Sequence, residues 1–257
     1  MISNRFLAML PLLISIPAEA GSRWLINDDF TDGDTVTFMG GFIMDECWAS
    51  VYVPEEGDYP FVPKYIDMLV AGAGSTHMFL VEFYALDGTD MRTASLMGEG
   101  AFTMTGSPSM WNRLTVAELE IGISPIEAGN LGVAICHYEH DGPPSIGVDS
   151  SRDAGHLSYL WGDFTGGFAE VDWWSTDVMA DYSLDLGIGI PIPAGVDVGG
   201  DWIMRTCIEN GGITGSCDGD DAGGSSSGGE ETGGEETGGA TSGGATSGGA
   251  TSGGATS

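Results

Sequence analysis

The sequence predicts an all-β fold, an antiparallel β-sandwich of the jelly-roll type with about ten strands. Short runs of alternating or continuous apolar residues recur along the chain, and turns rich in glycine, proline and aspartate separate them. No long stretch repeats its apolar residues with the period of 3.6 that an amphipathic helix requires. These observations favour sheets packed face to face over a helical class.

The strand pattern is strongest at residues 131–138, which we expect to form an interior strand. One face of this run carries Leu131, Val133 and Ile135, and the other carries Gly132, Ala134 and Cys136. Because both faces are apolar, the strand should be covered on two sides. His137 and Tyr138 should lie at its polar rim and tolerate replacement. The other extended segments expected are residues 24–27, 35–44, 47–53, 64–71, 77–86, 91–97, 101–105, 145–148, 156–161, 168–174 and 201–209, with a short helical turn at 117–120.

The two ends of the chain are expected to lie outside the folded domain. Residues 1–20 have the order of a secretory signal: Arg5, an apolar run at 6–16, and the cleavage site Ala18-Glu19-Ala20. Residues 218–257 repeat GGEET and GGATS and lack the apolar surface that folding needs, so they should be a disordered tail. One β-sandwich domain should therefore span residues 21–217, on an extracellular or cell-surface protein whose mature chain has no transmembrane segment.

The charge of the chain excludes two classes of partner. It carries 38 acidic residues against 7 lysines and arginines, a net charge of −31. Nucleic acid and anionic membranes would be repelled. The plainest interpretation of this acidity is solubility outside the cell, and calcium sites or a cationic polymer are the alternatives.

Four cysteines in an exported chain are typical of disulfides. Three connectivities are open for Cys47, Cys136, Cys207 and Cys217. We favour Cys207–Cys217, because residues 210–212 allow a close return that would fix the end of the domain. That choice leaves Cys47–Cys136, which would tie an early strand to the interior strand.

Several longer segments resemble a domain of uncharacterised exported proteins from myxobacteria and their relatives. These segments are DDFTDG, ECWASVYVPEEGDYPFVPKYIDML, VAICHYEHDGPPSIGVD and GDWIMRTCIE. The tail is similar to the Gly/Ser/Thr spacer that such proteins place before a carboxy-terminal sorting helix, but no apolar segment follows it here. The protein would then be released, or the chain truncated. The resemblance implies an exported all-β domain and no activity.

Two groups of side chains are candidate binding sites. Alternation places Trp173 in the core and Trp174 on the wet face with Glu170 and Asp172, where an exposed ring flanked by acids suits a sugar. Tyr159 and Trp161 would extend this platform. Carboxylates at Asp28, Asp29, Asp32 and Asp34 could hold calcium in a turn, although they do not follow the helix–loop–helix pattern.

The sequence offers no catalytic residues. His137, Glu139 and His140 have the chemistry of metal ligands, but their spacing does not fit a helical zinc motif and indicates the polar end of a strand. The only G-x-S-x-G match is residues 224–228, in the tail. The leading hypothesis is therefore a non-enzymatic surface or secreted structural or adhesion module without cofactor. The alternative is a carbohydrate-binding module, assisted by calcium, for an extracellular glycan or surface polymer.

Overall fold

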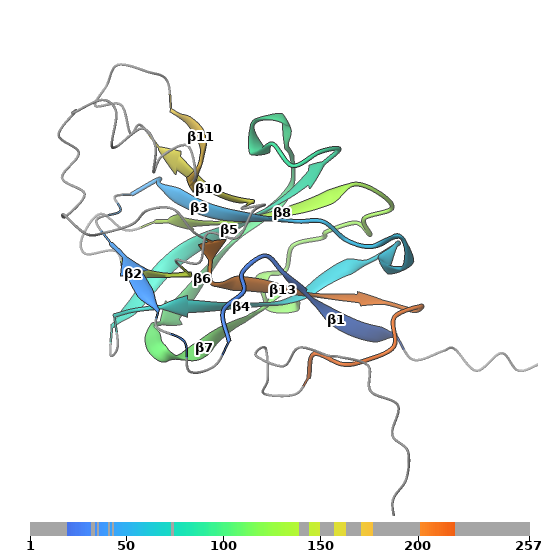
Figure 1. The fold of residues 1–257 in the computed structure, drawn as a ribbon, viewed down its shortest axis with the longest axis horizontal. Coiled ribbons are helices and arrows are strands. Elements are labelled where there is room, and N and C mark those ends of the chain that lie inside the picture. Colours follow the sequence, from blue (N-terminus) through green and yellow to red (C-terminus); the bar gives the residue numbers. More distant parts are fainter. Residues whose placement is uncertain are drawn as a thin grey trace, which may run out of the picture. The chain divides into compact units, whose positions relative to one another are not determined.

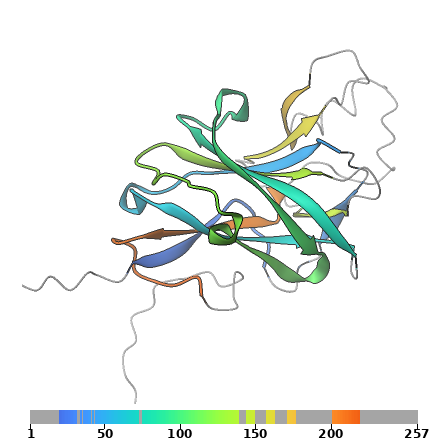
Figure 2. The same cartoon turned by 180° about the vertical axis from the view of Figure 1, so that it is seen from behind.

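The computed structural model describes residues 20–31, 34, 36–40, 42, 44–72, 75–138, 144–149, 157–162, 171–176 and 201–218. It confirms the predicted all-β sandwich: two antiparallel sheets lie face to face, and Figures 1 and 2 show these layers from opposite sides. The proposed signal peptide (residues 1–19 of it) and residues 219–257 of the proposed tail lie outside the described residues, so both stay predictions.

The first sheet has seven strands. Its main path is β1 (Gly21–Ile26), β13 (Met204–Asn210), β4 (Val62–Val70), β9 (Ile146–Asp149) and β12 (Asp201–Trp202), with β2 (Thr37–Met39) beside β9 and β7 (Ser107–Thr115) beside β4. The six-stranded sheet has the order β11 (Asp172–Ser175), β10 (Ser158–Gly162), β3 (Cys47–Tyr52), β8 (Asn130–His137), β5 (Thr76–Leu86) and β6 (Ser95–Thr105). Within the described ranges, three short 3-10 turns connect strands: η1 (Glu56–Asp58), η2 (Met91–Thr93) and η3 (Val116–Leu119).

The expected interior strand is confirmed as β8, which lies between β3 and β5. On its inner face Leu131, Val133 and Ile135 join the main core between the sheets. Its outer face is also covered: a Cβ atom at Gly132 would meet the Met91 sulfur of η2 at 2.9 Å. Glycine at this position therefore lets η2 pack directly on the strand, as a strand with two buried faces requires.

The main core is built around large rings. Trp48 of β3 and Trp202 of β12 are fully buried, and their ring centroids lie 6.1 Å apart. Tyr52 is buried with them and donates its hydroxyl proton to the carbonyl oxygen of Met204 at 2.6 Å. This bond satisfies a polar group that would be costly to bury alone, and it ties the two sheets together.

Both favoured disulfides are present. Cys47 and Cys136 face each other across β3 and β8, with Cα atoms 3.9 Å apart. Cys207 and Cys217 form the second bridge. Disulfides are typical of proteins that fold in an oxidising compartment, which agrees with an extracellular location.

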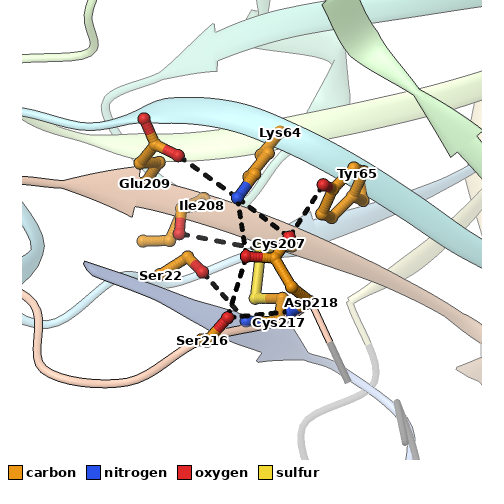
Figure 3. Close-up of polar contacts among 9 residues, drawn as sticks. All are labelled: Ser22, Lys64, Tyr65, Cys207, Ile208, Glu209, Ser216, Cys217 and Asp218. Carbon is orange, nitrogen blue, oxygen red and sulfur yellow. Dashed lines mark hydrogen bonds and ion pairs between the residues drawn. A yellow bond between two sulfur atoms is a disulfide. The ribbon is translucent and has the colours of Figure 1, made fainter. Parts of the chain in front are cut away.

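The second disulfide belongs to a group of contacts at the end of the domain, the C-terminal clamp (Lys64, Tyr65, Cys207, Cys217 and Asp218; Figure 3). Asp218 accepts hydrogen bonds from the Tyr65 hydroxyl at 2.8 Å and from Lys64 Nζ at 3.1 Å. These two donors, with the hydroxyl of Ser216, lower the pKa of Asp218 to about 2. Asp218, which we assigned to the tail, is therefore bound to the domain.

The expectation for His137 was wrong. Tyr138 is exposed (54%), but His137 is buried (2%) between the rings of Phe42 and Phe79, with centroid distances of 4.8 and 5.5 Å. Its Nε2 atom has no hydrogen-bond partner in the described part of the chain. Burial, reinforced by the charge of His77, lowers the pKa of His137 to about 4.

The buried His137 predicts acid sensitivity. Between about pH 6.5 and pH 4, His137 is protonated in the unfolded chain but stays neutral in the folded one. Lowering the pH through this range should therefore lower the free energy of unfolding, by at most about 3 kcal/mol. His137→Phe keeps a ring between Phe42 and Phe79 and removes the titration. Urea unfolding at several pH values should show a smaller loss for this variant than for wild type. If the stabilities of wild type and His137→Phe fell equally with decreasing pH, His137 would not be the source of the acid sensitivity.

Candidate functional site

A pocket of about 270 Å³ opens on the outer face of the six-stranded sheet. One row of residues runs beneath it across five strands, because the register pairs each with the next. The row is Trp173 of β11, Trp161 of β10, Cys47 of β3, Cys136 of β8 and Leu80 of β5. Asp45, Glu82 and Tyr84 complete the lining.

Three aromatic rings form an arc along the pocket. The ring of Trp173 lies 5.4 Å from that of Trp161 and 6.1 Å from that of Tyr84, centroid to centroid. The Tyr84 and Trp173 planes are nearly perpendicular, at 86°. Edge-to-face pairs of this kind are favourable. Trp173 is 8% exposed and anchors the arc, while Trp161 and Tyr84 are half-buried.

One carboxylate lies among these rings. Glu82 is two residues before Tyr84 on β5, so strand alternation puts both on the outer face, and the Tyr84 hydroxyl donates to Glu82 Oε2 at 2.6 Å. Burial raises the pKa of the Glu82 carboxyl, and the charge of Glu99 on the neighbouring strand raises it further. Glu82 is therefore a partly desolvated acid with a like charge beside it.

The floor and rim of the pocket hold the remaining polar groups. The floor is the Cys47–Cys136 disulfide, whose sulfurs lie within 4.8 Å of the Glu82 carboxylate. Bridged sulfurs are not thiolates, so this group is not a metal centre in the oxidised protein. At the rim, Asp45 occupies a turn with φ of 69°, a conformation that aspartate tolerates, and its N–H donates to the carbonyl of His137 at 2.9 Å.

The structure brings together part of the predicted sugar platform and corrects the rest. Trp161 lines the pocket, and Tyr159 lies on the same outer face, with its hydroxyl donating to the Thr89 carbonyl at 2.6 Å. Trp174, expected on the wet face, instead packs against the main core, and Trp173 takes the outer position. Asp172 accepts a hydrogen bond from the backbone N–H of Trp173 and does not line the pocket, and Glu170 lies outside the described residues.

The proposed calcium ligands do not form one cluster among the described residues. Asp28 is buried and paired with Arg205, whose Nη2 lies 2.5 Å from Asp28 Oδ1. Asp34 accepts from the backbone and hydroxyl of Thr31, at 2.8 and 2.7 Å, as turn aspartates do. Asp29 is exposed, and Asp32 lies outside the described residues. Asp28 is thus a structural ion-pair partner and is not available to calcium.

The histidine cluster is not assembled within the described residues either, because Glu139 and His140 lie outside them. A larger cavity of about 450 Å³ lies between β6, β7 and η3. Two of its polar side chains already have partners: Arg113 pairs with Asp67 at 2.8 Å, and the Asn112 amide donates to the Met68 carbonyl at 3.0 Å. The aromatic pocket is the better candidate site because its rings and carboxylate converge on one space.

Five lining residues were not predicted as site residues: Asp45, Leu80, Glu82, Tyr84 and Trp173, which was assigned to the core. The signal for three of them was present, since Leu80, Glu82 and Tyr84 alternate along a strand that was expected. Nothing in the sequence indicated that this strand would lie two positions from β3 and share a face with Trp161.

Comparisons with known proteins leave the family open. No family model matches the chain, and no curated protein does. The resemblance to the myxobacterial exported proteins therefore stays a prediction. Among the described residues, no helix is long and apolar enough to cross a membrane.

Two solved structures of the protein Cwp84 are similar to the chain. One is a variant of the clostridial cysteine protease Cwp84 after propeptide cleavage, with a TM-score of 0.43, 8% identity, and coverage of 73% of this chain and 40% of that one. The other holds the cysteine protease and lectin-like domains of Cwp84, a surface layer associated protein of Clostridium difficile. Its TM-score is 0.37 at 8% identity, and the match covers 65% of this chain and 32% of that one. The chain thus matches less than half of either, and neither likeness assigns it a family or a function.

Proposed function

We propose that this protein is an exported, non-catalytic adhesion module that binds extracellular carbohydrate through the outer-face pocket. The observation that carries the proposal is the convergence of Tyr84, Trp161 and Trp173 with the Glu82 carboxylate on one open space of about 270 Å³. Ligand pockets combine mostly apolar walls with a few polar groups in this way. The volume lies just below their usual range of about 300–1,000 Å³ and suits a single ring.

Carbohydrate fits these groups better than other neutral ligands do. One side of a pyranose ring presents C–H groups that pack on aromatic faces, while its hydroxyls donate to carboxylate oxygens. The Trp161 and Tyr84 rings supply the first kind of contact, and Glu82 and Asp45 supply the second.

Binding can be tested on a glycan array, read with and without EDTA. We expect binding that survives EDTA, because the aspartates proposed for calcium do not cluster in the described part of the chain. Trp161→Ala should weaken binding of the best glycan about 10-fold or more, the scale of a lost aromatic contact. Trp24→Ala is the matched control, since Trp24 is also half-buried but lies on the opposite sheet, 5.4 Å from the Arg113 guanidinium.

Three results would count against the proposal. If Trp161→Ala and Trp24→Ala weakened glycan binding equally, the binding surface would not be the outer-face pocket. Loss of binding in EDTA would restore a role for calcium. Release of shorter oligosaccharides from a bound glycan would show that the module is an enzyme.

A further inference from the structure

The charge of the pocket narrows the class of carbohydrate. We propose that the pocket binds sugars that carry a free ammonium group, as in polymers of deacetylated amino sugars, with the ammonium placed between Glu82 and the aromatic arc. This inference rests on the proposed carbohydrate site and specifies its ligand.

The lining of the pocket is acidic and, among the described residues, contains no basic side chain. Asp45 and Glu82 supply the carboxylates, and Glu99, directly opposite Glu82 on β6, adds a third negative charge nearby. Uronic acids and other anionic sugars would be repelled. A cation would offset both the desolvation of Glu82 and its repulsion by Glu99, which raise the pKa of its carboxyl against the opposing hydrogen bond from Tyr84.

The aromatic rings add a second attraction for a cation. An ammonium over the face of tryptophan or tyrosine is attracted by the ring quadrupole, most strongly when water is partly excluded. Tyr84 both contributes a ring and donates to Glu82 Oε2 at 2.6 Å, so it holds the carboxylate beside the arc. A neutral sugar would use the rings but bring no positive charge to the carboxylates.

The charge of the whole chain acts in the same direction. A protein with a net charge of −31 attracts a polycation from a distance and raises its local concentration. This field alone would give weak binding that salt abolishes, because exposed charges are screened within about 8 Å at physiological ionic strength. Binding in the pocket should be stronger and localised at Glu82, and this difference makes the inference testable.

The test compares three tetramers by isothermal titration calorimetry at physiological salt: glucosamine, N-acetylglucosamine and glucose in β-1,4 linkage. We expect the glucosamine tetramer to bind wild type most tightly. Glu82→Gln keeps an acceptor for the Tyr84 hydroxyl and removes the charge. It should weaken glucosamine binding by about 10- to 100-fold, the scale of a charge-assisted hydrogen bond, and weaken the two uncharged tetramers much less, because the amide oxygen still accepts from sugar hydroxyls.

Glu127→Gln is the control, because Glu127 is an exposed acid that does not line the pocket. Equal losses in Glu82→Gln and Glu127→Gln would show general attraction to the acidic surface and overturn the inference. If all three tetramers bind equally and Glu82→Gln changes none of them, the ammonium preference fails while the carbohydrate site stands. If no tetramer binds and the glycan array is also blank, both proposals fail.

Discussion

Arg205→Met is expected to lower the free energy of unfolding by about 3–5 kcal/mol, because it leaves the buried Asp28 without its ion-pair partner. Arg205 is 3% exposed on the outer face of the seven-stranded sheet. It binds Asp28 and the Phe30 carbonyl, and its guanidinium lies 4.8 Å from the centre of the Trp111 ring. The segment from Asp28 to Phe30 is thus held on the sheet by one cation, and urea denaturation at neutral pH measures the loss.

Two further measurements separate the ion pair from simple packing. Asp28→Leu combined with Arg205→Met removes both charges and should regain most of the lost stability. Burial already raises the pKa of Asp28 to about 6 against the opposing effect of Arg205. Without Arg205 the folded Asp28 carboxyl binds a proton more readily still. The loss of stability in Arg205→Met relative to wild type should therefore become smaller as the pH falls from about 7 to about 5. A deficit that is constant with pH would contradict the electrostatic account.

Ile135→Ala is expected to cost about 2–5 kcal/mol, the range for a large-to-small change in a packed core. Ile135 is fully buried in the main core, opposite Trp48 on β3 and Val81 on β5. Neighbours on two hydrogen-bonded strands cannot move in to fill the cavity without breaking their own ladders, so relaxation should be small. Chemical denaturation with an unchanged m-value would report this loss directly.

Tyr138→Ala is the control for Ile135→Ala, because Tyr138 lies three residues along the chain and is 54% exposed. Exposed substitutions usually change stability by less than about 0.5 kcal/mol. If Ile135→Ala and Tyr138→Ala lowered the free energy of unfolding by similar amounts, the assignment of Ile135 to the core and Tyr138 to the surface would be wrong.

The fold was largely predictable because local alternation and turn residues agree with the sandwich. Both disulfides match the pairing that was favoured among three open connectivities, because residues 210–212 allow a close return. The segments 91–97 and 101–105 were expected as two strands, but Ser95–Thr105 form the single strand β6, which contains Gly98 and Gly100, and Met91–Thr93 form η2. A Cβ atom at Gly100 would meet Leu119 at 3.2 Å and Ile121 at 3.3 Å. The glycines make room for a covering segment, a long-range cause that sequence periodicity does not contain.

Strand β7 was missed because its residues, SPSMWNRLT, alternate weakly and include Pro108. It pairs with β4, which has a second neighbour in β13. Proline is tolerated in strands that are paired on one side only, so β7 satisfies the backbone of β4 without a strong pattern of its own.

The candidate site was only half predictable, for a related reason. Alternation correctly separated Trp173 from Trp174 but assigned each to the wrong face. On β10 and β11 both faces carry large apolar groups, since one packs on the main core and the other forms the aromatic arc. When both faces are apolar, the alternation of residues along a strand does not indicate which face packs against the opposite sheet. The burial of His137 was unpredictable in the same way, because Phe42, which covers it, lies 95 positions earlier in the chain.

The C-terminal clamp has a mechanical consequence. A pull on the chain beyond Asp218 passes through the Cys207–Cys217 bridge and reaches β13 at its middle residue rather than at its end. Cys207 is paired with Trp24 of β1 on one side and with Tyr65 of β4 on the other. The load is therefore shared at once by two ladders of hydrogen bonds, which must slip together, whereas a pull on the end of a strand opens its bonds one after another. A pull on this end should therefore leave β1, β13 and β4 paired at forces that would open a single ladder.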